Sequence, residues 1–187
     1  MTYRAKVTEY ADLGSAKALA NPLRQRILRQ LALDGEATAT TLARKLGVTT
    51  GGTSYNLRVL AEHGFVEELT GRPGRERWWR TARRNLRFPV HSEQDPAMRS
   101  ALTELDELWR SGDQEALGRF LAARDELGEW GDALPYSRGR IRVTLPELAE
   151  FFEEYLRLIE RYSRHEDSED ADERREVLTR FIAFPSM

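Results

Sequence analysis

Arginines and small polar residues are the side chains of this sequence whose types and spacing best fit a chemical task. Arg58 follows a run of threonine, glycine and serine, and three more arginines fall between residues 72 and 77. Guanidinium groups donate paired hydrogen bonds to phosphates and to base edges, and hydroxyls can donate or accept at the same edges. This combination is typical of a surface that binds a polyanion. The residues selected on this basis are Thr49, Thr50, Gly51, Gly52, Ser54, Tyr55, Arg58, Arg72, Arg75 and Arg77.

Catalytic and metal-binding arrangements are missing from the sequence. The chain has no cysteine, which excludes disulfides, thiolate metal sites and cysteine nucleophiles. Its three histidines, His63, His91 and His165, lie in separate segments, so clustered imidazole ligands are not expected. There is no glycine-rich phosphate loop and no nucleophile elbow, and Glu153 and Glu154 fall on a charged helix face. The sequence therefore predicts a non-enzyme with no metal and no cofactor.

The charge is divided unevenly along the chain. Residues 1–88 hold 16 Lys+Arg and 8 Asp+Glu, a net of +8, whereas residues 89–187 hold 13 Lys+Arg and 23 Asp+Glu, a net of −10. A basic half joined to an acidic half indicates that one half meets a polyanion. An arginine-rich surface that is merely soluble would show the same imbalance, so the charge alone leaves both interpretations open.

The selected residues fall on one predicted helix and one predicted hairpin. Apolar residues at helical spacing between residues 49 and 63 place Thr53, Leu57 and Leu60 on an inner face, so the polar residues between them face outward. Glycine disfavours a helix by about 0.5–1 kcal/mol relative to alanine. Gly51 and Gly52 therefore either allow a partner to approach closely or lie in a turn before a helix that starts at Thr53.

The hairpin is predicted from two short segments rich in aromatic and β-branched residues. These segments are 65–69 and 77–80, and the glycine- and arginine-rich tip lies between them. Trp78 and Trp79 point to opposite faces of the second strand, so one of them is expected in the core. Helical spacing also predicts helices upstream of the hairpin, over 11–20, 22–34 and 41–46.

This order of helices and hairpin resembles the arsenical-resistance-repressor (ArsR)-like winged helix-turn-helix family. The motifs that carry the resemblance are KALANPLRQRIL at 17–28, LARKLGV at 42–48, SYNLRVL at 54–60 and GFV at 64–66. It covers roughly residues 13–83 and implies a bacterial transcription regulator that binds double-stranded DNA. Asn56 stands where the family often has histidine, and Thr53 where it often has an aliphatic residue. The family's metal sensors use cysteine or clustered histidine, so metal sensing is not carried over.

The second half of the chain is expected to be helical, with apolar stripes that suit a homodimer interface. Two helices are predicted within 97–127, and an amphipathic helix follows Pro146. Short strands at 141–145 and 177–184 are expected to pair. The aromatic residues fit either an ordinary core or a pocket for a small apolar effector. The candidate pocket residues are Trp109, Phe120, Trp130, Phe152 and Tyr155.

The expected fold is mainly α with a small β component. A winged helix-turn-helix DNA-binding domain occupies 1–88, and a helical dimerisation and effector region with a short strand pair occupies 89–187. No apolar run approaches the roughly 20 residues of a membrane helix, and residues 1–9 lack the apolar core of a secretory signal, so a cytoplasmic protein is expected. The predicted function is sequence-specific regulation of transcription, as a homodimeric repressor. The alternative is a winged-helix assembly module without sequence-specific DNA binding.

Overall fold

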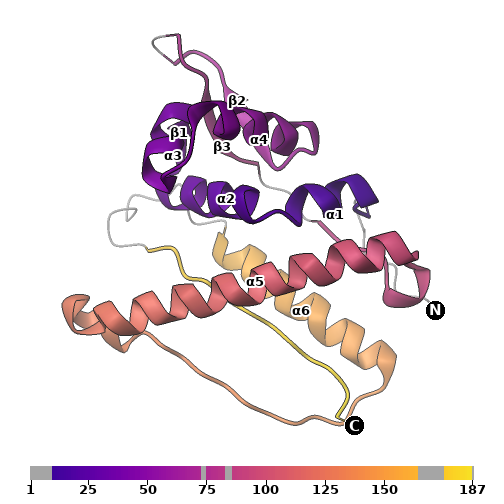
Figure 1. The fold of residues 1–187 in the computed structure, drawn as a ribbon. Helices are drawn as coiled ribbons and strands as arrows, with labels where there is room; N and C mark the ends of the chain where they lie inside the picture. Colours follow the sequence, from indigo (N-terminus) through magenta and orange to yellow (C-terminus); the bar gives the residue numbers. More distant parts are fainter. Residues whose placement is uncertain (1–9, 73–74, 83–85, 164–174, 187) are drawn as a thin grey trace. The chain divides into compact units, whose positions relative to one another are not determined.

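The computed structural model describes residues 10–72, 75–82, 86–163 and 175–186 (Figure 1). Two compact units make up the chain, Met1–Pro135 and Tyr136–Met187. The division predicted between residues 88 and 89 separates a DNA-binding part from a dimerisation part, and it stays a prediction about function. By compactness alone, the long helix that follows residue 95 belongs with the N-terminal elements.

The first two helices begin at side chains that cap their free backbone N–H groups. α1 (Leu13–Leu19) follows Asp12, whose carboxylate accepts a hydrogen bond from the Ser15 N–H at 2.7 Å. α2 (Pro22–Asp34) follows Asn21, whose side chain accepts from the Arg24 N–H at 3.1 Å. The asparagine cap followed by proline sets the start of α2, because proline fits the first turn of a helix.

The helix-turn-helix pair consists of α3 (Ala39–Leu46) and α4 (Thr50–Glu62). Thr49 Oγ1 accepts from the Gly52 N–H at 3.2 Å and so caps α4. Both glycines therefore lie in the first turn of the helix. The alternative in which the helix starts at Thr53 and leaves the glycines in a turn is wrong.

A three-stranded antiparallel sheet packs with these helices. β1 (Glu36–Thr38), β2 (Val66–Leu69) and β3 (Trp78–Thr81) lie in the order β1-β3-β2. We call residues 66–81, which hold β2, β3 and their connection, the wing. β1 was not predicted, because three residues are too short to show a periodic pattern.

One tryptophan of β3 is in the core, as predicted. Trp79 is 5% exposed and lies in register with Ala37 of β1 and Glu68 of β2. Its neighbour Trp78 is only half-buried. The core of the first unit gathers residues from α2, α3, α4, the sheet and the following long helix. Its innermost members are Ile27, Leu31, Leu42, Leu57, Leu60 and Leu105.

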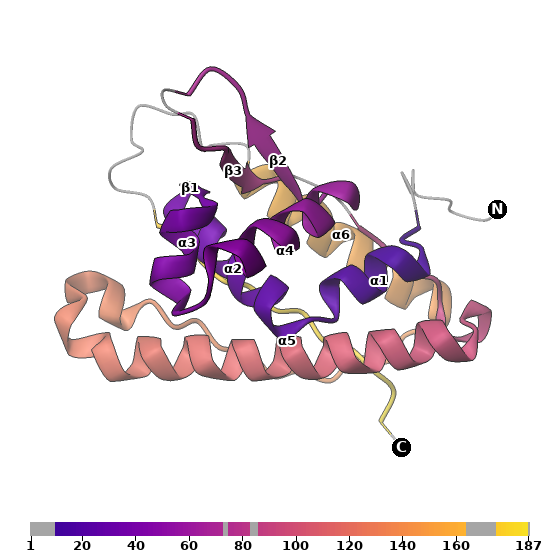
Figure 2. The ribbon, with the colours of Figure 1, turned by 45° about the horizontal axis from the view of Figure 1, so that its top comes forward.

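A single helix, α5 (Pro96–Ala123), replaces the two helices predicted within 97–127. It runs along α1 and α2 (Figure 2). Met98, Ala101 and Leu105 are buried, the first two in a cluster with Ala16 of α1. Much of the apolar stripe expected at a dimer interface is therefore covered within the chain itself. Two 3₁₀ turns, Arg124–Glu126 and Gly128–Asp132, follow the helix.

The second unit contains α6 (Leu145–Ser163) and the segment 175–186. At the start of α6, Glu147 Oε2 accepts from the Thr144 N–H at 2.7 Å and from the Thr144 hydroxyl at 2.8 Å. These bonds lower the pKa of Glu147 below its ordinary value. This reciprocal arrangement of threonine and glutamate fixes where the helix begins.

The strand pair predicted at 141–145 and 177–184 does not form, since neither segment contains a strand. Side chains attach the C-terminal segment to α6 instead of a backbone ladder. The Phe181 ring lies 4.8 Å from the Tyr155 ring and 5.6 Å from the Phe152 ring, centroid to centroid. The Tyr155 hydroxyl also donates to Thr179 Oγ1 at 3.1 Å. Aromatic stacking has taken the place of the predicted pairing.

Candidate nucleic-acid interface

The outer face of α4 is polar and open to solvent. Thr53, Leu57 and Leu60 are 0% exposed, as the helical spacing predicted. On the opposite face Tyr55 is 61% exposed and Arg58 is also exposed. Tyr55 is therefore not packed into the core. A tyrosine and an arginine held away from the core can both reach a partner molecule.

An open hollow of about 440 Å³ lies where α3, α4 and the wing meet. Thr50 and Ser54 line it from the first turns of α4, and Arg58 lines it from the next turn. Arg77 reaches it from the wing. Four of the residues selected from the sequence therefore share one concave surface. The other residues that line it are Ala39, Thr40, Glu76 and Trp79.

A half-buried hydrogen-bond network behind α4 supports its first turns. The Arg24 guanidinium donates from Nη1 to Asn56 Oδ1 at 3.2 Å and from Nη2 to the Lys17 carbonyl at 2.9 Å. Asn56 Nδ2 in turn donates to the Gly52 carbonyl at 2.8 Å. Burial lowers the pKa of Arg24 from its ordinary value. Sequence reasoning placed Asn56 only as a departure from the family pattern and missed Arg24 altogether.

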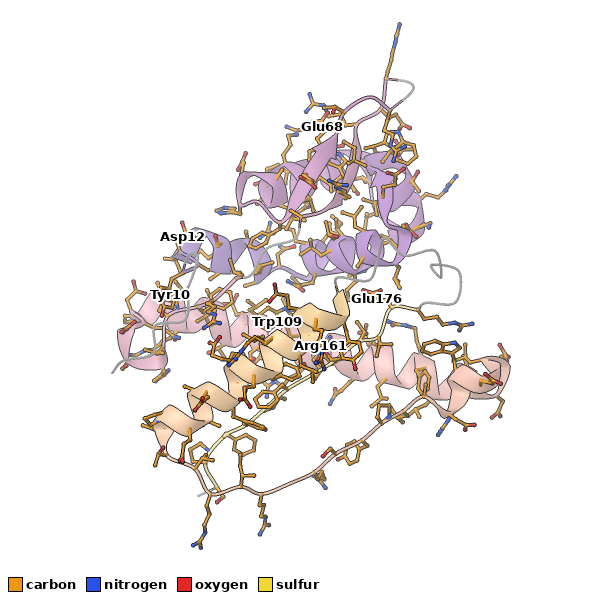
Figure 3. All side chains as sticks on the ribbon, turned by 180° about the vertical axis from the view of Figure 1, so that it is seen from behind. Tyr10, Asp12, Glu68, Trp109, Arg161 and Glu176 are labelled. Carbon is orange, nitrogen blue, oxygen red and sulfur yellow. The ribbon has the colours of Figure 1, made fainter. Side chains whose placement is uncertain are left out.

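The wing arginines are held by carboxylates of the sheet. Arg72 pairs with Glu36 of β1. Arg77 Nη1 lies 3.4 Å from Glu68 Oε2, and Figure 3 labels Glu68 on β2. These glutamates were not considered in the sequence, because a pairing between residues far apart in the chain leaves no local pattern. A phosphate that binds these arginines must compete with the paired carboxylates.

Arg58 and Arg75 have no ion pair with any residue in the ranges that the structure describes. Both are exposed, Arg58 on α4 and Arg75 near the tip of the wing. Residues 73–74 of the tip lie outside the described residues. Unpaired guanidinium groups on a surface are available to an anionic ligand without first breaking an internal contact.

The candidate effector residues are distributed over both units. In the first unit Trp109 of α5 is 43% exposed, and its ring lies 6.4 Å from that of Phe88. Phe120 and Trp130 are half-buried in the same unit. In the second unit, Phe152 and Tyr155 stack with centroids 6.4 Å apart. Trp109, Phe120 and Trp130 thus belong to the first unit, and Phe152 and Tyr155 to the second.

Within the described ranges, no group of three or more histidine, cysteine, aspartate or glutamate side chains could hold a metal ion. No helix in those ranges is both long and apolar enough to cross a membrane.

One comparison with known proteins bears on the N-terminal part of the chain. Residues 19–68 match the model of a family described as a helix-turn-helix domain. No curated protein sequence matches the chain.

Three solved structures are similar to part of the chain. One is the antimony-specific transcriptional repressor AntR, at 22% identity over 60% of this chain and 98% of that chain, with a TM-score of 0.34. A second is a ZitR mutant from Lactococcus lactis in apo form, at 22% identity over 57% of this chain and 82% of that chain, with a TM-score of 0.33. The third is RV1404 from Mycobacterium tuberculosis, at 20% identity over 62% of this chain and 83% of that chain, with a TM-score of 0.32. At these TM-scores the likeness says nothing of what this chain binds.

The family-model match at residues 19–68 covers α2, α3 and α4 and ends within β2, the first strand of the wing. Domains of this kind place the second helix of the pair in the DNA major groove. Residues 19–68 therefore match a helix-turn-helix domain, and the β2–β3 hairpin follows it in the structure as a wing.

Proposed function

We propose that this protein is a sequence-specific, homodimeric transcription regulator in which α4 enters the DNA major groove and the wing contacts phosphates. The observation that carries the proposal is the shared hollow, where Ser54 and Arg58 of α4 meet Arg77 of the wing. An α-helix with its side chains is about 10–12 Å across, and the major groove is about 12 Å wide. The helix can therefore reach base edges while the wing follows the backbone.

The first turns of α4 supply the groups that would meet the bases. Thr49, Thr50 and Tyr55 are exposed, and Ser54 is half-buried. Hydroxyls can donate to or accept from the base edges of the major groove, which distinguish all four base pairs. Gly51 has open space where a Cβ would lie, so the helix can approach a groove wall closely there. The complete proposed contact set is Thr49, Thr50, Gly51, Gly52, Ser54, Tyr55, Arg58, Arg72, Arg75 and Arg77.

Homodimer formation is part of the proposal. α5 leaves Trp109, Leu117 and Leu121 more than 40% exposed, at 43%, 46% and 48%. Leu117 and Leu121 are four residues apart and so share a face of the helix. A two-fold axis through such a face would give two copies of α4 and a palindromic site with half-sites one or more helical turns apart. The sign of regulation that we propose is repression.

A small apolar effector is a further proposal that concerns the aromatic side chains. Phe152 is 38% exposed and lies beside Phe181, so a ligand that displaced Phe181 could stack on the α6 aromatic residues. In this proposal Trp109 of the first unit contributes to the dimer interface and does not contact the ligand. We propose no enzymatic activity. A protein that binds chromosomal DNA must lie in the cytoplasm of a bacterial cell, so the proposal includes a cytoplasmic location.

Selection of bound duplexes from a random DNA pool, with the full-length chain, tests this function. The proposal expects an enriched motif with two-fold symmetry and half-sites about 10–10.5 base pairs apart or a multiple of that spacing. It also expects light scattering to give the mass of a dimer at tens of micromolar. A pool that stays random after repeated rounds would favour the assembly-module alternative. A clear but asymmetric motif, together with a monomeric mass, would contradict the proposed dimer and leave the proposed sequence-specific DNA binding standing.

A further inference from the structure

A single carboxylate lies in the hollow between α4 and the wing. Glu76 lines the hollow beside Arg58 and Arg77. Its Oε1 accepts a hydrogen bond from the Thr40 hydroxyl at 2.6 Å, which links the wing to α3. Glu76 is not among the residues selected from the sequence, because an acidic residue does not fit a simple polyanion-binding pattern.

Glu76 differs from the other glutamates of the sheet in what it contacts. Glu36 pairs with Arg72, and Glu68 with Arg77. Glu67 Oε1 lies 2.6 Å from the Arg80 Nε. Within the described ranges, Glu76 has no such cation, and its hydrogen-bond partner is the neutral Thr40 hydroxyl. Its negative charge is therefore not balanced by an ion pair inside the described part of the chain.

A carboxylate at this place acts differently on phosphates and on bases. It can only accept hydrogen bonds, so a DNA phosphate, which also only accepts, is repelled. An amino group at a base edge, as on cytosine, can instead donate to it. A duplex that lies against the hollow and contacts it through phosphates alone is attracted by the arginines and repelled by this carboxylate. A duplex that fits the protein in register can present a donor to the same carboxylate.

We propose that Glu76 is a specificity-determining residue, which weakens the binding of non-cognate DNA through its carboxylate more than it weakens the binding of the cognate site. This inference rests on the proposed DNA-binding function. It assigns the acidic residue of the hollow a role opposite to that of the arginines. The arginines raise affinity for any duplex, and Glu76 raises the ratio between the selected duplex and the rest.

The test compares Glu76→Gln with the full-length wild-type chain. Each protein is titrated against the duplex selected by the wild-type chain and against a random-sequence duplex of equal length, over a salt series. Glu93→Gln is the matched control, because Glu93 is exposed on the turn before α5 and its replacement changes the net charge equally. Circular dichroism and a urea titration check that each variant is folded.

We expect Glu76→Gln to bind the random duplex about twofold to fivefold more tightly than wild type, a range typical of one exposed charge contact. Its affinity for the selected duplex should rise less or fall, so the ratio of the two affinities falls. An unchanged or increased ratio overturns the inference, and so does a fall of the same size in Glu93→Gln. If the wild-type chain selects no duplex at all, the proposed function itself has failed, and this outcome is distinct from an unchanged ratio.

Discussion

Arg24 and Asn56 are hydrogen-bonded to each other across the junction of α2 and α4, with 3.2 Å between Nη1 and Oδ1. Asn56 is 9% exposed, and its amide nitrogen donates to the Gly52 carbonyl in the first turn of α4. A polar side chain on the inner face of α4 thus connects α2 to the turn that carries the proposed base contacts. The position of that turn depends on a network rather than on apolar packing alone.

Replacement of Asn56 by leucine should destabilise the fold by about 1–3 kcal/mol, because it leaves the half-buried Arg24 donor and the Gly52 carbonyl without their side-chain partner. Affinity for the selected duplex should fall as well, since the Gly52 turn loses its support. The measurement is urea unfolding followed by DNA titration. Tyr55→Ala is the control, because Tyr55 is exposed and its loss should change stability by no more than about 0.5 kcal/mol. Equal stability losses in the two variants would contradict a structural role for Asn56.

Gly51→Ala should raise the stability of the fold and lower its affinity for DNA. A Cβ at Gly51 meets no atom within 4 Å, and alanine favours a helix by up to about 1 kcal/mol over glycine. The variant should therefore unfold at a higher urea concentration and yet bind the selected duplex more weakly. Gly118→Ala in α5, also in open space, calibrates the gain in stability. A stabilised Gly51 variant that keeps full affinity would show that DNA does not approach this turn closely.

Arg75→Ala should weaken binding about equally on selected and random duplexes, because phosphates are the same at every sequence. The slope of log affinity against log salt should fall by about one unit. Arg72→Ala should have a smaller effect, since Arg72 must first leave Glu36. Ser54→Ala and Tyr55→Ala should instead cost on the order of 1–3 kcal/mol on the selected duplex only. If the wing and α4 variants lost affinity for the selected and random duplexes in the same proportions, the assignment of phosphate contacts to the wing and base contacts to α4 would be wrong.

Asp12, labelled in Figure 3, gives the first helix a pH-dependent contribution to stability. The hydrogen bond from the Ser15 N–H lowers the pKa of Asp12 below 3.8, so the folded state binds this proton less readily than the unfolded state. The stabilisation is therefore complete above that value and is lost as the pH falls through the lower folded pKa. Asp12→Ala should cost about 0.5–2 kcal/mol at neutral pH.

Asp12→Asn keeps a capping oxygen but cannot titrate, so it serves as the control for this pH dependence. Urea unfolding of the three proteins from pH 7 to pH 2.5 is the measurement. The difference between wild type and Asp12→Asn should shift in the acid range, and that between Asp12→Asn and Asp12→Ala should stay nearly constant. A wild-type curve parallel to that of Asp12→Asn throughout would contradict the pKa shift.

The N-terminal fold could be predicted well from the sequence because its signals are local. Asn21 followed by proline marks the start of α2, and the spacing of Thr53, Leu57 and Leu60 orients α4. The features that sequence reasoning missed involve contacts between distant residues. β1 is too short to show alternation, and the Glu36–Arg72 and Thr40–Glu76 contacts each join residues 36 positions apart.

The second half of the chain was harder to predict because its elements are not defined by turn residues. Gly112 and Gly118 do not interrupt α5, because a glycine costs a helix only about 1 kcal/mol relative to alanine, and Gly112 is buried against Arg29 of α2. The apolar residues of 141–145 and 177–184 suggested strands, but Phe181 packs on the aromatic residues of α6 instead. Aromatic packing leaves no periodic pattern by which it could have been recognised.

The central claim is that the exposed face of α4 reads DNA sequence. Its most direct test is the ratio of the affinities of the full-length chain for the selected duplex and for a scrambled duplex of the same composition, at one near-physiological salt concentration. The account predicts a ratio of about 10³ or more, as expected for specific over non-specific binding. A ratio near one would contradict the account and leave the winged helix as an assembly module.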